Sequence, residues 1–226
     1  MQIALTFDAE HPDRPHCPSG VAERIAAILQ KARVRATFFL QGRWVEAYPH
    51  VAKDIAGCGH RIGNHSFYHA RLALLSDDGL IRDIGAADEV IRAVTGENPK
   101  PWFRCPWGEG GDDPRVLRVL NGLGYRHVGW NVHGGECQMD RTPREVGDTV
   151  VNGVLTVGET AAILLHTWAA SVPAALPAII RRLREAGGEF VTLDELDPAT
   201  LSVKPCVCIE RPGNGAGKPG KRGGGQ

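Results

Sequence analysis

The sequence predicts an α/β protein whose parallel strands form a closed or nearly closed barrel. Two observations predict this class. Short apolar runs alternate with longer stretches of helical periodicity along almost the whole chain, and strands that alternate with helices form parallel sheets with crossover connections. The alternation continues through about seven units, a number that favours a barrel over an open doubly wound sheet.

The short apolar runs are the predicted strands. Residues 3–7 and 36–40 are almost continuously apolar, which is typical of strands that are buried on both faces. The predicted strands cover residues 3–7, 36–40, 60–63, 101–104, 125–132, 160–165 and 189–193.

The longer stretches are the predicted helices. In residues 21–31, apolar side chains recur every three or four positions, as they do on the buried face of a helix. Pro143 suits the first turn of a helix, where its missing N–H costs nothing. The predicted helices cover residues 21–31, 45–58, 77–94, 114–123, 143–154 and 172–186.

Composition and charge exclude several classes of protein. The chain has 226 residues, and 26 basic residues balance 26 acidic ones, so no basic excess indicates a nucleic-acid partner. No run approaches the ~18 apolar residues of a membrane span. The chain enters its first predicted strand without a secretory signal, so we expect a cytoplasmic location. Nothing indicates a protein partner.

The last residues differ in composition from the rest. Residues 198–226 are rich in glycine and basic residues, and such a segment buries too little apolar surface to offset chain entropy. We therefore expect a folded domain over residues 1–197 and a flexible tail over 198–226. Cys206 and Cys208 lie in this tail and are either free thiols or a small metal site.

Chemically active residues follow nearly every predicted strand. In a parallel barrel, catalytic residues gather at the carboxyl ends of the strands. The residues at or just beyond these ends are Asp8, Glu10, His65, His69, Arg104, Trp107, His133, Glu136 and His166. If residues 66–68 form a helical turn, the rings of His65 and His69 lie on one face and can share a metal ion.

Other polar and aromatic residues have simpler interpretations. His60 is expected to be structural and His127 to lie at the surface or in a loop. Trp168 is expected in the core or at the rim of the site. His133 is equally compatible with contact to substrate and with simple solvation.

Several motifs, in this order, resemble those of the polysaccharide deacetylases, the NodB-homology carbohydrate esterases. The resemblance covers about residues 2–196, and its motifs are LTFDAE, GHRIGNHSFYH, WFRCPWG, GWNVHGGEC and ILLHTW. It implies a distorted (β/α)7-type barrel, a catalytic domain over residues 1–197 and one divalent metal ion. Zinc is the first choice for this ion, with cobalt, nickel or manganese as alternatives.

The resemblance also implies roles for individual residues. Asp8 matches the general base, Arg104 the arginine that pairs with it, and His166 the general acid. His65 and His69 match two metal ligands. Three further residues match the substrate pocket. The backbone N–H of Trp107 matches the donor to the oxyanion, and the side chains of Trp130 and Leu164 match those that contact the acyl methyl.

The chain departs from the family pattern at two places. Ala9 stands where the family usually has a metal-binding aspartate, so Glu10 is expected to be the third ligand, with His11 as the alternative. Near the fourth motif, Glu136 replaces the usual aspartate and is expected to orient His166.

The function implied is metal-dependent removal of an N-acetyl or related acyl group from an amino sugar or oligosaccharide. Two alternatives remain at this point. One is an amide or ester hydrolase with a non-sugar substrate, and the other is a catalytically weak relative that binds carbohydrate.

Overall fold

A computed structural model of the chain describes residues 1–12, 18–138 and 140–196. Its strands form one sheet in the order β5-β4-β3-β2-β1-β7-β6, with β8 paired to β1, and every pairing is parallel. The predicted barrel of the distorted (β/α)7 type is confirmed. The strands are β1 (Gln2–Ala9), β2 (Thr37–Leu40), β3 (Arg61–Asn64), β4 (Trp102–Phe103), β5 (Arg126–His127), β6 (Val132–His133), β7 (Thr160–His166) and β8 (Glu189–Val191).

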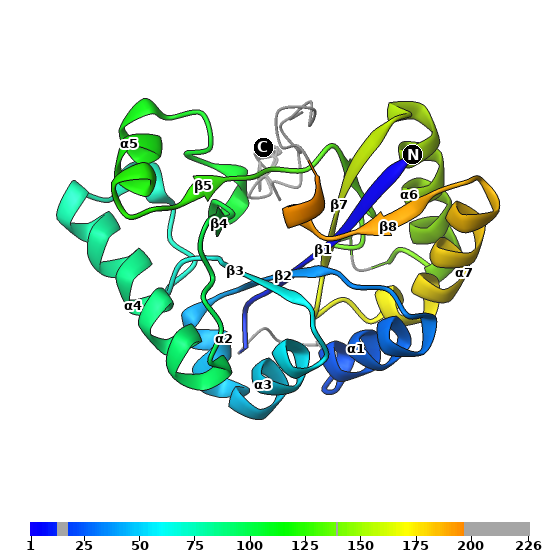
Figure 1. Ribbon diagram of the computed structural model, residues 1–226, viewed down its shortest axis with the longest axis horizontal. Coiled ribbons are helices and arrows are strands. Elements are labelled where there is room, and N and C mark those ends of the chain that lie inside the picture. Colours follow the sequence, from blue (N-terminus) through cyan, green and yellow to red (C-terminus); the bar gives the residue numbers. More distant parts are fainter. Residues whose placement is uncertain (13–17, 139, 197–226) are drawn as a thin grey trace, which may run out of the picture.

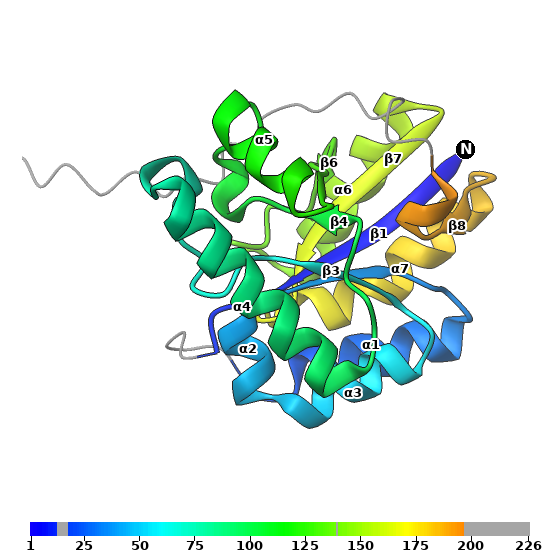
Figure 2. The ribbon, with the colours of Figure 1, turned by 60° about the vertical axis from the view of Figure 1, so that its left-hand side comes forward.

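The helices lie along the outer side of the sheet. In Figure 1 they form an arc from α4 through α3 and α1 to α7, and the turned view in Figure 2 shows α1 and α3 on the same side of β1 and β3. The helices are α1 (Val21–Ala32), α2 (Gly42–Ala47), α3 (Pro49–Gly57), α4 (Asp77–Thr95), α5 (Pro114–Gly122), α6 (Pro143–Val157) and α7 (Ser171–Glu185). Among the described residues, no helix is both long and apolar enough to cross a membrane.

Strand β1 lies at the centre of the sheet and fixes which way its side chains point. β7 pairs with it from Gln2 to Asp8, while β8 and β2 pair with the beginning and end of its other edge. Leu5 and Phe7 pack in the large cluster shared with the outer helices, whereas Ala4 belongs to a separate inner cluster. Since side chains alternate along a strand, Asp8 lies on the inner face at the carboxyl end.

The barrel is not closed between β5 and β6. The single strand predicted over residues 125–132 is therefore wrong, and Trp130 lies between two strands rather than within one. On the β6 side of this opening, the side chain of Asn131 adds hydrogen bonds to β7. Its Oδ1 accepts from the Ala162 N–H at 2.9 Å, and its Nδ2 donates to the Thr160 carbonyl at 3.0 Å.

The single helix predicted over residues 45–58 is also wrong. α2 ends before Tyr48 and α3 begins at Pro49. The ring of a proline disfavours helical backbone at the residue before it, and Tyr48 accordingly has φ of −130°. The predicted tail at 198–226, with Cys206 and Cys208, lies outside the described residues, so the domain boundary at residue 197 stays a prediction.

His60 has the structural role expected for it. The Ala36 N–H donates to its Nδ1 at 3.2 Å, and the ring is buried against Phe38. Burial lowers the pKa of His60 to about 4, because a charged imidazolium is poorly solvated there. The folded protein therefore holds this ring neutral.

This burial predicts a pH dependence of stability. Between about pH 6.5 and pH 4 the unfolded chain protonates His60 and the folded protein does not, so the free energy of unfolding falls as the pH falls through this window. The contribution of His60 is present in full above pH 6.5 and is on the order of 3 kcal/mol.

Urea unfolding at pH 7 and pH 4.5 measures this effect. His60→Gln is expected to lose less stability than wild type on acidification, because glutamine does not titrate. His50→Gln, at an exposed position of α3, is the control and is expected to match wild type. Equal losses in wild type and His60→Gln would show that the buried ring is not the cause.

Candidate metal centre and active site

Two acidic residues at the end of β1 lie at the bottom of the site. Asp8 is the register partner of His166 in β7, and Glu10 lies two residues beyond Asp8, so alternation directs both side chains to the inner face. Ala9 points the other way, fully buried in the outer cluster. The acid of Glu10 thus faces the site, and the apolar side chain of Ala9 faces the helices.

The loop after β3 brings both predicted histidines to Glu10. Oε2 of Glu10 lies 3.1 Å from Nε2 of His65 and 2.5 Å from Nε2 of His69. The helical turn considered for residues 66–68 is wrong, since Ser66 has φ of +62°. Nδ1 of His65 lies 2.9 Å from the Arg104 carbonyl, and as a donor there it leaves Nε2 free to bind a metal ion.

Glu10, His65 and His69 form a group that could hold a metal ion. One ligand atom from each lies within 4.8 Å of the others, and all three residues are buried. Burial opposes ionisation of Glu10, but His69, His65 and His166 outweigh it and hold the pKa of this carboxyl well below its usual range. An ionised carboxylate between two imidazoles is a donor set that fits zinc and similar ions.

Arg104 holds Asp8 in place. Nη1 of this fully buried arginine donates to Oδ1 of Asp8 at 2.8 Å. Its other nitrogens donate to carbonyls of the segment between β5 and β6, at 3.4 Å to Val128 and 3.1 Å to Gly129. The remaining oxygen of Asp8, Oδ2, lies 3.6 Å from Nε2 of His65 and so faces the metal-ligating group.

His166 lies at the end of β7 with Glu136 behind it. Nδ1 of His166 is 2.8 Å from Oε1 of Glu136, while Nε2 lies 3.8 Å from Oε1 of Glu10. Burial lowers the pKa of His166, but the hydrogen bond to Glu136 and the charge of Glu10 outweigh it and raise the pKa to about 10. The ring can therefore hold a proton at neutral pH.

Of the three residues predicted to line the substrate pocket, Trp107 contacts the metal-ligating group through His69. Trp107 has φ of +62°, is 43% exposed, and packs edge-on against His69 at 4.6 Å between ring centroids. The buried Trp130 lies against Gly108, where an added Cβ would come within 3.1 Å of its ring. Leu164 is buried in β7, two residues before His166.

Three further residues make contacts that the sequence did not specify. Nε1 of Trp168 donates to Oε1 of Glu10 at 3.1 Å, so this tryptophan touches the metal-ligating group directly. His11 lies 3.4 Å from the same oxygen. His127 lies in β5, and its Nδ1 accepts from the Cys105 N–H at 3.3 Å, so its expected place at the surface or in a loop is wrong.

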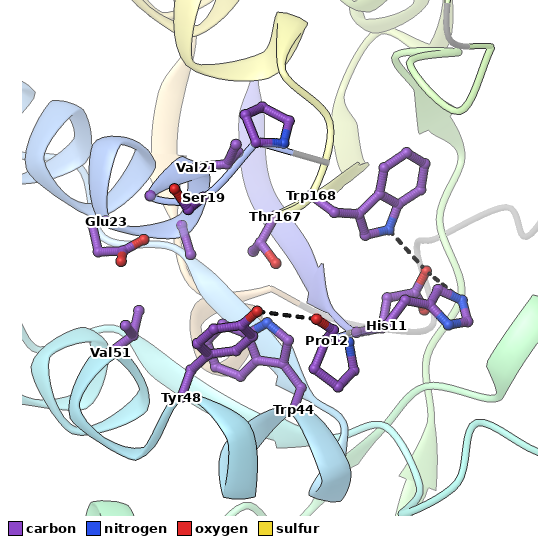
Figure 3. A pocket seen from close by; sticks show the side chains of 14 residues that line it. His11, Pro12, Ser19, Val21, Glu23, Trp44, Tyr48, Val51, Thr167 and Trp168 are labelled. Atoms are coloured by element: carbon purple, nitrogen blue, oxygen red, sulfur yellow. Dashed lines mark hydrogen bonds and ion pairs between the residues drawn. The ribbon is translucent and has the colours of Figure 1, made fainter. Parts of the chain in front are cut away.

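A pocket of about 160 Å³ opens beside Glu10. In Figure 3, Trp44 and Tyr48 line one side of it and Thr167 and Trp168 another. The hydroxyl of Tyr48 donates to the Pro12 carbonyl at 3.0 Å. The metal-ligating group therefore borders a space with aromatic walls.

Comparison with known proteins identifies the family. A profile described as polysaccharide deacetylase matches residues 1–128. A peptidoglycan-N-acetylglucosamine deacetylase from Bacillus cereus is 31% identical over 203 residues, which cover 86% of this chain and 68% of that protein. The chain belongs to the polysaccharide deacetylase family, as its motifs predicted.

Solved structures share the fold. A family 4 acetyl xylan esterase from Clostridium thermocellum, in complex with a cobalt ion, has a TM-score of 0.74 at 31% identity, over 86% of this chain and 89% of that one. A CE4 family pseudoenzyme from Bacillus anthracis has a TM-score of 0.76 at 27% identity, over 86% of this chain. Only 64% of the pseudoenzyme is covered, so this chain spans less than two thirds of it.

Proposed function

We propose that this protein is a metal-dependent hydrolase that removes an N-acetyl or related acyl group from an amino sugar or oligosaccharide. The proposal rests on one observation: two ion pairs flank a group of three candidate metal ligands. Glu10, His65 and His69 form that group, Asp8 and Arg104 lie on one side, and His166 with Glu136 lies on the other.

Glu10, His65 and His69 would hold one divalent ion, with zinc as the first choice and cobalt, nickel or manganese as alternatives. Two imidazoles and a carboxylate are a ligand set that catalytic zinc uses, with one coordination position left open. Such an ion polarises an acyl carbonyl and lowers the pKa of water when it is bound.

The surrounding residues would then carry the proton transfers. Asp8 accepts the proton of the attacking water, with Arg104 fixing the orientation of its carboxylate. The backbone N–H of Trp107 would donate to the negative charge that develops on the acyl oxygen when water attacks the acyl carbon. His166, oriented by Glu136, gives its proton to the departing nitrogen, because an amine leaves poorly without one.

The substrate would place its acyl methyl between Trp130 and Leu164. Both side chains are buried and apolar at the inner face of the barrel, so they favour a small apolar group over a charged one. Its relatives include deacetylases of peptidoglycan and of chitooligosaccharides. We therefore propose N-acetylglucosamine oligomers as the first substrates to test.

Acetate release from N-acetylglucosamine oligomers tests the function. We expect purified protein to contain about one equivalent of metal, to release acetate, and to lose this activity to background after chelation. Restoring the ion is expected to restore the rate. Acetate release that is unchanged after complete removal of the metal would contradict the proposal.

Two alternative functions have specific support among the relatives. The acetyl xylan esterase favours an ester substrate, and the pseudoenzyme favours binding without hydrolysis. Acetate release from acetylated xylan, but not from N-acetylglucosamine oligomers, would identify an esterase instead of an N-deacetylase. Oligomer binding without acetate release at full metal occupancy identifies the second. The cytoplasmic location stays a prediction, which cell fractionation tests.

A further inference from the structure

The loop that carries His65 and His69 needs support from outside itself. Ser66 has φ of +62° and His69 has φ of +57°. Left-handed backbone at residues other than glycine costs about 1–3 kcal/mol each and persists only where surrounding contacts enforce it. The separation of the two imidazoles depends on this backbone, because only three residues lie between them.

Four of the backbone groups in this loop are held by its immediate surroundings. The His65 N–H donates to the Leu40 carbonyl at 3.0 Å, and the Ser66 N–H donates to Oδ1 of Asn64 at 2.8 Å. The His69 N–H donates to Oγ of Ser66 at 3.0 Å. On the acceptor side, the Ser66 carbonyl accepts from the Gly42 N–H at 2.9 Å.

The two N–H groups in the middle of the loop both donate to one carboxylate on α4. Oδ2 of Asp83 accepts from the Phe67 N–H at 3.1 Å, and Oδ1 accepts from the Tyr68 N–H at 3.0 Å. Asp83 is only 7% exposed. A buried carboxylate is stable only when its lone pairs are satisfied, so the side chain and the loop fix each other.

The same part of α4 also holds the start of the loop. Nδ2 of Asn64, the last residue of β3, donates to the Ile84 carbonyl at 3.1 Å and to the Tyr125 hydroxyl at 3.1 Å. One turn of α4 thus determines where β3 ends and where the middle of the loop lies. A shift of this turn would move His69 relative to His65.

We propose that Asp83 is a positioning residue that sets the geometry of the two histidine ligands. It touches neither the ligand atoms nor the substrate pocket, and it acts through the backbone of Phe67 and Tyr68. This inference rests on the proposed function, since it concerns the metal that the histidines would bind. Outer contacts that orient metal ligands typically contribute 10–100-fold in affinity.

Asp83→Asn tests the proposal with the smallest change in shape. The amide keeps one acceptor oxygen but turns an NH2 donor toward the other backbone N–H, so one of the two hydrogen bonds is lost. We expect the metal dissociation constant to rise by about 10–100-fold, measured by competition with a chromophoric chelator. At saturating metal, kcat is expected to stay near the wild-type value.

Asp77→Asn is the matched control on the same helix. Asp77 accepts from Nη1 of Arg115 at 2.9 Å and from Nη2 of Arg118 at 3.3 Å, and neither arginine belongs to the histidine loop. Both variants are expected to lower the melting temperature, but only Asp83→Asn is expected to weaken metal binding. Equal dissociation constants in the two variants would overturn the proposal.

Asp83→Glu provides a second, independent measurement. It keeps the charge and both acceptor oxygens, displaced by one methylene, so we expect metal affinity between those of wild type and Asp83→Asn. If Asp83→Asn does not fold, the metal dissociation constants of Asp83→Glu and Asp77→Glu are compared instead, with the same expected difference. A wild-type protein that binds no metal would instead contradict the proposed function, so the two failures are distinguishable.

Discussion

His69→Ala and His65→Ala are each expected to bind no metal at micromolar concentrations and to release no acetate above background. Each change removes one of two imidazole nitrogens that converge on Oε2 of Glu10. Loss of outer contacts alone costs about 10–100-fold in metal affinity, so loss of a ligand is expected to exceed that range. Elemental analysis of the purified variants, with acetate release on N-acetylglucosamine oligomers, measures both effects.

His50→Ala is the control for these variants, because this exposed histidine lies on α3. It is expected to retain metal and activity. Full metal occupancy in both His65→Ala and His69→Ala would contradict the proposed site.

Glu10→Gln is measured in the same experiment and is expected to lose metal. If it stays loaded and active, Glu10 is not the third ligand, and His11→Asn becomes the variant to examine.

Asp8→Asn is expected to retain metal and to lower kcat by about 10²–10⁴-fold, the usual contribution of a general base. Asparagine can still accept the hydrogen bond from Arg104, so the local structure is expected to persist. The lost property is the ability to take a proton from water. Single-turnover acetate release at full metal occupancy measures the effect without interference from product release.

Asp88→Asn controls for the chemical change itself, since it also replaces a hydrogen-bonded aspartate by its amide. Its kcat is expected to equal that of wild type. An Asp8→Asn protein with unchanged kcat would mean that another group takes the proton. Lost activity together with lost metal would assign Asp8 to the ligand set instead, beside Glu10 and His166.

The order of the elements could be predicted from the sequence because buried strands and amphipathic helices have distinct periods. The break between α2 and α3 had a local signal in Pro49, which was overlooked. The gap between β5 and β6 had a weak local signal in Gly129 and Asn131, residue types that are depleted in strands. Val128 and Asn131 keep backbone hydrogen bonds to Phe103 and Ala162, so the break falls at Gly129 and Trp130.

The candidate site was predicted mostly from residue types at strand ends and from motif resemblance. Asp83 was missed because α4 carries several acids, and a sequence does not distinguish a buried one from its solvated neighbours. Its spacing from Leu80 and Ala87 nevertheless places it on the buried face of the helix. The contact between Trp168 and Glu10 was missed because it joins residues 158 positions apart.

The incomplete closure of the barrel has a consequence for the charge at its centre. Beside the opening between β5 and β6, the carbonyls of Val128 and Gly129 accept hydrogen bonds from Arg104 and so solvate its buried guanidinium. Without those oxygens, Nε and Nη2 of Arg104 would be buried without hydrogen-bond acceptors, which is costly. The irregular wall therefore supplies the acceptors that let the Arg104 side chain lie fully buried beside Asp8.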